Sequence, residues 1–316
     1  MLNASSEPLE RWWARLVVAL LRRREPTHSE RIGLRTGVSR RYAGSSHQYV
    51  LLQLGLERAL SDAEFRDVAI RRSGLWLDFG VFRALSTNLT SLYLRKLLPD
   101  TPTDDSVVVD GFDTWFGLPE TWFKRQRAGG GGPLNIYFHA GKFSWAEHAK
   151  SHGLGPTPPT LPRIALHTGL FAQSLPPFLS ARAGRPVAWA SIDCDLATGT
   201  RDVLRAIGPR IVPGSRLHFH ELLKTPDLDR AASWLRSTGG GGAAGRVEQE
   251  GGGKAAARGG ASEVPRATPG NVLPPSDEAR ALYEWLRSHP RVVLELDATQ
   301  SKGNREAALT VCRRAR

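Results

Sequence analysis

The chain has 316 residues, of which 41% are hydrophobic and 23% charged, and its formal net charge is +12. This composition is typical of a globular domain and argues against a chain that is disordered throughout. No stretch reaches the roughly 20 apolar residues of a membrane-spanning helix. The two cysteines, Cys194 and Cys312, provide neither a disulfide framework nor a CxxC metal motif, which favours a reducing compartment. We therefore expect a cytoplasmic or organellar protein that is not secreted.

Residues 1–45 are predicted to form a basic N-terminal arm that contains a helix. Nine arginines between Arg11 and Arg41 outnumber the four glutamates of this segment. A basic amphipathic helix can lie on an anionic surface or pack on the domain that follows it, and packing is the simpler interpretation. No aromatic-and-basic nucleic-acid motif accompanies the arginines, so nucleic acid is a disfavoured partner.

Residues 46–316 are predicted to form one domain with low-complexity insertions at about 125–163 and 237–275. The first insertion contains four consecutive glycines and a proline-rich stretch, and the second contains glycine and alanine runs followed by prolines. Such segments bury too little apolar surface to offset the entropy of ordering them. We therefore expect irregular loops at both places.

Strands and helices alternate between these insertions. The apolar patterns predict strands at 75–79, 107–109, 164–166, 187–192, 216–219, 292–296 and 309–312. They predict helices at 85–93, 171–183, 196–207 and 279–286, with Ser86 or Thr87 capping the first of them and Ser276 the last. This alternation is typical of an α/β domain whose mostly parallel sheet is covered on both faces. Ligands of such sheets bind beyond the carboxyl ends of the strands.

The ends of the first two strands carry residues suited to a nucleoside. Gly80 follows the first strand and allows a tight turn where a ligand approaches, next to a helix N-terminus with free N–H groups. Asp113 ends the second strand, where α/β folds place an acid on ribose hydroxyls. Alternatively, Asp113 is a turn carboxylate that accepts from its own backbone.

The ends of two later strands carry a concentration of titratable groups. Asp193 and Asp195 close a hydrophobic strand, and their mutual repulsion requires a compensating cation or proton. His220 and Glu221 end the next strand and could complete a metal site with Asp193. Alternatively, the aspartates are solvated helix caps and His220 only forms a hydrogen bond.

Five segments, taken in order, resemble the macrocin O-methyltransferase family within the class I S-adenosylmethionine-dependent methyltransferases. They are FGVFRALSTN, GFDTWFGLPE, IDCDLATGT, RIVPGSRLHFHE and DEARALYEWL. The resemblance covers about Leu75 to Cys312 and leaves out the N-terminal arm. It implies a Rossmann-like sheet of seven mostly parallel strands with an antiparallel last strand and helices on both faces.

The resemblance also implies a reaction and a set of site residues. The reaction is O-methylation of a small-molecule hydroxyl, on a sugar or secondary metabolite, with S-adenosylmethionine as methyl donor. The cofactor would lie near Asp78, Gly80, Ser86 and Asp113, and Asp195 would be the catalytic base. A divalent metal, magnesium or manganese, would be held by Asp193, His220 and Glu221.

Two positions depart from the family pattern. Ala84 stands where glycine is common, and His220 stands where aspartate is common. Magnesium prefers oxygen ligands, whereas imidazole suits zinc, iron or manganese. The departures leave open a catalytically inactive, methyltransferase-like binding protein.

Asp193-Cys194-Asp195 is also a DxD motif, as in metal-dependent glycosyltransferases, although GFDTWFGLP fits that class poorly. Nothing in the sequence indicates an oligomeric state.

Overall fold

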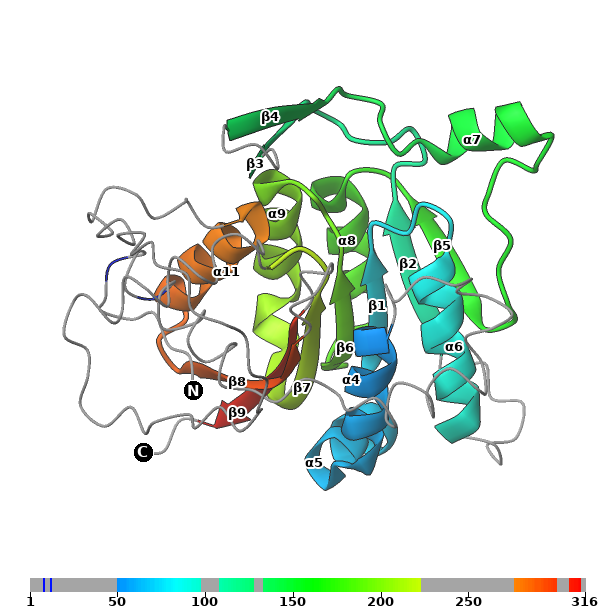
Figure 1. The fold of residues 1–316 in the computed structure, drawn as a ribbon. Helices are drawn as coiled ribbons and strands as arrows, with labels where there is room; N and C mark the ends of the chain where they lie inside the picture. Colours follow the sequence, from blue (N-terminus) through cyan, green and yellow to red (C-terminus); the bar gives the residue numbers. More distant parts are fainter. Residues whose placement is uncertain are drawn as a thin grey trace, which may run out of the picture.

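A mixed sheet of seven strands forms the centre of the computed structural model, which describes Pro8, Trp12 and residues 50–97, 108–127, 133–222, 276–299 and 307–313. The strand order is β5-β2-β1-β6-β7-β9-β8 (Figure 1). The strands are β1 (Leu75–Phe79), β2 (Val109–Asp113), β5 (Ile164–Thr168), β6 (Val187–Ile192), β7 (Ile211–Phe219), β8 (Val292–Thr299) and β9 (Ala307–Arg313). Five of them, from β5 to β7 in this order, are parallel, and β9 runs antiparallel to β7 and β8. The predicted α/β class, with parallel strands and covering helices, is confirmed.

Helices cover both faces of this sheet. One face carries α8 (Phe171–Ser180), α9 (Ala197–Ile207) and α11 (Asp277–Ser288). The other face carries α4 (Val50–Ser61), α5 (Ala63–Arg66), the π-helix η3 (Asp67–Arg71) and α6 (Leu85–Leu97). The 3-10 turn η4 (Gly208–Arg210) joins α9 to β7. Ser276 caps α11 as predicted, because its hydroxyl accepts a hydrogen bond from the Ala279 N–H at 3.0 Å.

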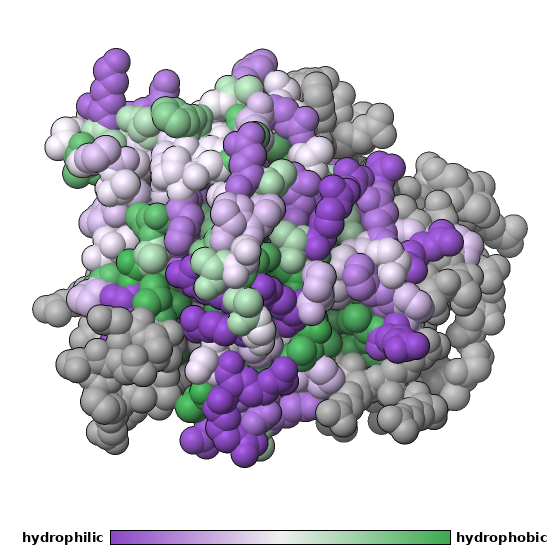
Figure 2. Space-filling view, turned by 180° about the vertical axis from the view of Figure 1, so that it is seen from behind, coloured by the Kyte–Doolittle hydropathy of each residue, from purple (hydrophilic) through white to green (hydrophobic). Residues whose placement is uncertain are grey.

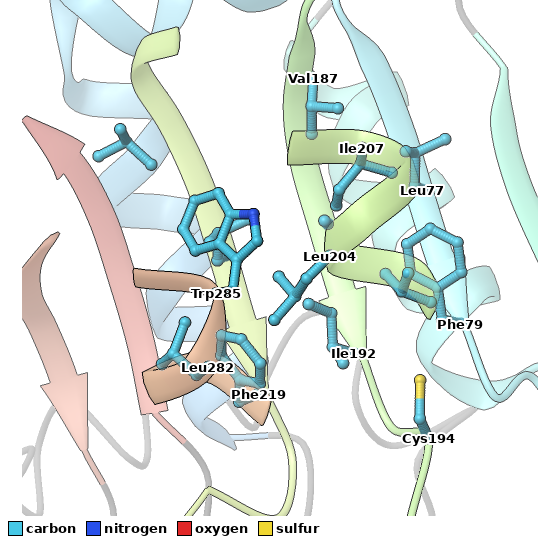
Figure 3. Close-up of a cluster of buried hydrophobic side chains, with 14 of the residues drawn as sticks. Leu77, Phe79, Val187, Ile192, Cys194, Leu204, Ile207, Phe219, Leu282 and Trp285 are labelled. Carbon is cyan, nitrogen blue, oxygen red and sulfur yellow. The ribbon is translucent and has the colours of Figure 1, made fainter. Parts of the chain in front are cut away.

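The larger core lies between the sheet and the α8–α9–α11 face. Figure 3 shows side chains of α9 and α11, among them Leu204 and Trp285, meeting Leu77 and Ile192 from the strands. Alternate residues of β1 point to opposite faces, so Leu77 joins this core while Trp76 joins the core under α4 and α6. Because both faces of the strands are buried, their sequences are continuously hydrophobic instead of alternating.

Trp12 is fully buried in the larger core. Its ring lies 5.4 Å from that of Tyr283 on α11, between centroids. The N-terminal arm is therefore anchored to the domain at Trp12, while residues 1–45 other than Pro8 and Trp12 lie outside the described residues. Within the described part of the chain, no helix is both long and apolar enough to cross a membrane.

The segment between β2 and β5 contains regular elements that its composition did not predict. A two-stranded antiparallel hairpin is formed by β3 (Trp122–Arg127) and β4 (Pro133–Phe138), and α7 (Trp145–His152) follows. Ser144 caps α7 and Gly153 ends it in the left-handed region. The hairpin and α7 both lie above the carboxyl edge of the sheet (Figure 1). The expectation of an irregular insertion over 125–163 is therefore corrected, and 237–275 lies outside the described residues.

The rear surface shows no broad hydrophobic face among the coloured residues. Figure 2 shows hydrophobic residues there as separate patches between hydrophilic ones. The lower end of this view, which is the end where α5 lies in Figure 1, is mainly hydrophilic. The concave features that suit a ligand lie at the opposite, carboxyl edge of the parallel strands.

Candidate active site

A cavity of about 660 Å³ opens at the carboxyl edge of the sheet. Its walls come from the turns after β1, β2, β6 and β7, the starts of α8 and α9, and the segment before β3. Six of the predicted site residues line it: Gly80, Ser86, Asp113, Asp193, Asp195 and Glu221. Asp78 and His220 are buried behind the wall.

The turn after β1 passes very close to the end of β6. Gly80 has φ +83°, and a Cβ built there would lie 2.0 Å from the carbonyl oxygen of Asp193. The following turn places Phe82 and Ala84 at φ +43° and +57°. Ala84 thus adopts the left-handed conformation that glycine favours, so the departure from glycine leaves the turn formed.

Asp78 supports this turn from below and does not face the cavity. Its Oδ2 accepts hydrogen bonds from the hydroxyls of Ser86, at 2.8 Å, and Thr87. Both hydroxyl residues lie inside the first turn of α6, which begins at Leu85, so the predicted N-cap role for them is corrected. Burial raises the pKa of Asp78, against the opposing hydrogen bonds from Thr87 and Ser86.

Asp113 joins the turns after β1 and β2. Its Oδ2 accepts from the Phe82 N–H at 2.9 Å, and its Oδ1 accepts from the Trp115 N–H at 2.8 Å. Burial raises the pKa of Asp113, and these two N–H groups oppose the increase. The bond to Trp115 is the local turn contact that the sequence left as an alternative. Asp113 also lines the cavity, so its structural role is compatible with the predicted ligand role.

Asp193 and Asp195 form the floor of the cavity after β6. The Asp193 N–H donates to the Phe79 carbonyl at 2.9 Å, which fixes this loop to the end of β1. Asp195 has φ +59°, in a tight turn where the Leu196 N–H donates to the Cys194 carbonyl. Burial, and then the Asp195 carboxylate, raises the pKa of Asp193 well above its usual value. A carboxyl group whose pKa is raised in this way favours its protonated form, next to the second carboxyl group of Asp195.

The predicted metal ligands do not converge. His220 Nδ1 lies 3.9 Å from Asp193 Oδ2, while its Nε2 contacts the Ser191 hydroxyl at 3.0 Å. His220 is 5% exposed and stands behind the wall that Glu221 helps to form. In the described ranges, no three His, Cys, Asp or Glu side chains are grouped so that they could hold a metal ion. In this arrangement the three residues do not form a three-ligand site, and a divalent metal at this place stays a prediction.

Several wall residues were missed by sequence reasoning. Leu118, Pro119 and Phe143 come from the segment between β2 and β5, where no periodic pattern marks a site. The carboxyl group of Glu120 accepts a hydrogen bond from the Thr198 hydroxyl at 2.6 Å, which joins that segment to the start of α9. Such contacts between distant parts of the chain leave no spacing signal in the sequence.

The cavity is acidic although the chain is strongly basic. Among the described lining residues, one guanidinium faces six carboxyl groups: Arg83 against Asp113, Glu120, Asp193, Asp195, Asp202 and Glu221. Arg83 lies at the α7 side, where its NH2 contacts His148 Nδ1 at 3.5 Å. Such a lining attracts cations and repels phosphates, in contrast to the net charge of +12 of the whole chain.

The structure is similar to solved O-methyltransferases. CalS11, a calicheamicin methyltransferase, matches with a TM-score of 0.41 and 19% identity, over 74% of this chain and 86% of CalS11. The O-methyltransferase NovP matches with a TM-score of 0.35 and 14% identity, over 72% of this chain and 91% of NovP. The O-methyltransferase from Bacillus cereus in complex with SAH matches with a TM-score of 0.36 and 13% identity, over 97% of this chain and 100% of that protein.

These similarities are too low to carry an argument about what this chain does. No protein-family model matches the sequence, and no curated protein matches it. Membership of the macrocin family stays a prediction, and the functional argument rests on the chain's own residues.

Proposed function

We propose that this protein is an S-adenosylmethionine-dependent O-methyltransferase that acts on a small-molecule hydroxyl. The observation that carries the proposal is that Gly80, Asp113 and the Asp193–Asp195 pair share one cavity at the carboxyl edge of a parallel sheet. The seven strands and the antiparallel last strand, β9, agree with what the family resemblance implies and support the proposal.

The side of the cavity beside β1 and β2 suits the cofactor. Asp113 would accept from the ribose hydroxyls, Gly80 would let the backbone approach, and Ser86 lies at the open start of α6. S-adenosylmethionine would supply a methyl group on a positively charged sulfur. The acidic lining favours that cation over a neutral nucleoside.

The floor of the cavity provides the proton acceptor. S-adenosylmethionine would supply the methyl group to the acceptor oxygen and would keep the electron pair of its sulfur–carbon bond on sulfur, while Asp195 would accept the hydroxyl proton. Asp193, whose raised pKa favours the protonated form, would hold the acceptor by a hydrogen bond. Leu118, Phe143 and Leu196 in the wall would exclude water from this step.

The charge of the lining limits the acceptor. With five carboxyl groups besides Asp113 in the described lining, an uncharged or amine-bearing hydroxyl compound is favoured over a phosphorylated one. A glycosyltransferase receives less support, because its nucleotide-sugar diphosphate would face a single arginine, Arg83. An inactive binding protein is also less favoured, since Ala84 leaves the turn after β1 formed.

We expect S-adenosylhomocysteine to stabilise the protein thermally and Asp113→Asn to remove most of that stabilisation. A ligand at a hundred times its Kd adds about 2.7 kcal/mol to the unfolding free energy. The measurement is the ligand-induced shift of the melting temperature, because the variant also alters the two backbone bonds of Asp113. Asp67→Asn, at the other end of the sheet, is the matched control and should keep the full shift.

The same assay separates the alternatives. A shift with UDP-sugars and none with S-adenosylhomocysteine would support the glycosyltransferase. An unchanged wild-type melting curve at millimolar S-adenosylhomocysteine would contradict the cofactor assignment.

A further inference from the structure

Two carboxyl groups of the cavity wall have no role in the proposed methyl transfer. Glu120, in the segment before β3, and Asp202, on α9, both line the cavity. The Thr198 hydroxyl donates a hydrogen bond to the Glu120 carboxyl group at 2.6 Å. Thr198 and Asp202 are four residues apart on α9, so their side chains are neighbours on the same face of this helix. Thr198 therefore brings the Glu120 carboxyl group to the part of α9 that carries Asp202.

No cation of the described chain neutralises these two carboxylates by an ion pair. Within the described ranges, neither Glu120 nor Asp202 forms an ion pair. Arg201, next to Asp202 in the chain, pairs with Glu284 of α11, and its Nε lies 2.5 Å from a carboxyl oxygen of Glu284. Arg83, the guanidinium of the described lining, lies at the α7 side. The negative charge of Glu120 and Asp202 is thus open to a ligand.

The cofactor does not balance the negative charge of the cavity. Even with Asp193 protonated, as its raised pKa favours, the other five carboxyl groups of the described lining face only Arg83 and the net positive charge of S-adenosylmethionine. Like charges gathered in one cavity repel each other unless a cation lies among them. A methyl acceptor with its own positive charge would lower this repulsion, whereas a neutral acceptor would leave it unchanged.

The chain around Glu120 and Thr198 also supplies an apolar surface. Leu118 and Leu196 line the cavity and belong to one small hydrophobic cluster. Phe143 lines the cavity too, and 36% of the residue is exposed. Exposed hydrophobic side chains in a concave site indicate a ligand with an apolar part, and an aromatic face also attracts an ammonium group.

We propose that the methyl acceptor is an amine-bearing hydroxyl compound whose ammonium group binds to Glu120 and Asp202 and whose apolar part lies on Phe143. The inference rests on the proposed function, because it names the substrate class of the same site. Glu120 and Asp202 are specificity-determining residues and take no part in the proton transfer. The ammonium group donates charge-assisted hydrogen bonds to both carboxylates, whereas a phosphorylated acceptor is repelled by them.

The test compares hydroxyl-bearing amines with their N-acetyl derivatives, which keep the hydroxyl groups and lose the positive charge. The probes are amino sugars such as glucosamine and hydroxyphenyl amines such as tyramine, titrated calorimetrically into the full chain with saturating S-adenosylhomocysteine. At least one amine should bind about tenfold more tightly than its N-acetyl form, or better. Glu120→Gln and Asp202→Asn should each remove most of this preference, while affinity for the N-acetyl form stays within about threefold.

Glu120→Gln keeps an oxygen that can accept from the Thr198 hydroxyl, so it removes the charge and spares the local structure. Glu147→Gln is the matched control, because Glu147 is an exposed acid of α7 that does not line the cavity. This control removes the same charge and should keep the full preference. Three results would overturn the proposal: no amine preferred over its N-acetyl form, a preference that survives both site variants, or an equal loss in the control.

Failure of this inference and failure of the proposed function give different results. If the wild type binds S-adenosylhomocysteine but prefers no amine, only the inference about the acceptor is wrong. If the wild type does not bind S-adenosylhomocysteine, the methyltransferase assignment is wrong, and the same titrations without it still test whether Glu120 and Asp202 select amines. In methyl transfer, both variants should raise the KM for the amine and change kcat little, because neither residue acts in the chemical step.

Discussion

Gly80→Ala should lower the free energy of unfolding by about 3 kcal/mol or more, because the added methyl group meets the backbone of another strand end. The new Cβ would lie 2.0 Å from the Asp193 carbonyl oxygen, and the residue would keep a left-handed φ of +83°. The contact is with backbone, so no side-chain rotation relieves it. The measurement is denaturant unfolding, read as the midpoint and slope.

Gly153→Ala is the control for the conformational part of that loss. Gly153 ends α7 at φ +64°, and a Cβ there has nothing within 4 Å. Its replacement should cost only about 1 kcal/mol, the penalty of the left-handed conformation alone. Equal losses in the two variants would show that the β1 turn relaxes away from β6 and that the close approach is unimportant.

Asp195→Asn should lower kcat by about 100-fold to 10,000-fold, because it removes the proposed proton acceptor while keeping the size of the side chain. The assay is methyl transfer from labelled S-adenosylmethionine to a panel of uncharged and amine-bearing hydroxyl compounds. Affinity for S-adenosylhomocysteine should stay within about threefold, since the residue acts in the chemical step.

Two further variants test whether methyl transfer depends on Asp195 alone or on Asp193 and Asp195 together. Asp193→Asn imitates a protonated Asp193 and should retain more activity than Asp195→Asn. Asp67→Asn lies at the amino ends of the strands and should retain full activity. Activity of Asp195→Asn within about threefold of the wild type would assign the proton acceptor elsewhere.

The sheet was predictable because its strands are buried on both faces. Continuous apolar runs at 75–79 and 187–192 match β1 and β6 at both ends. The β-branched run at 107–109 meets the second strand only at Val109, because β2 spans Val109–Asp113, while its end at Asp113 agrees with the prediction. The glycine of this strand, Gly111, packs against Val81. Tertiary packing, and not the strand propensity of its own residues, determines that this segment forms a strand.

The site was only partly predictable, for a related reason. Strand-end acids such as Asp113 and Asp195 can be found from the sequence, since parallel strands bring their carboxyl ends to one edge. The direction of a side chain cannot be found in this way. Asp78 turns to Ser86 and Thr87, and His220 turns to Ser191, both behind the wall.

The junction between Leu222 and Ser276 has a consequence for how this protein can change over evolution or be engineered. Leu222 and Ser276 stand 54 positions apart in the sequence, and the Ser276 hydroxyl joins them by donating to the Leu222 carbonyl at 2.9 Å. A loop whose two ends are fixed in this way can change in length at an entropic cost that rises only with its logarithm. The insertion predicted at 237–275 lies between these two points, so we expect it to accept a grafted module. Such a module would be tethered at Leu222, next to Glu221 in the cavity wall.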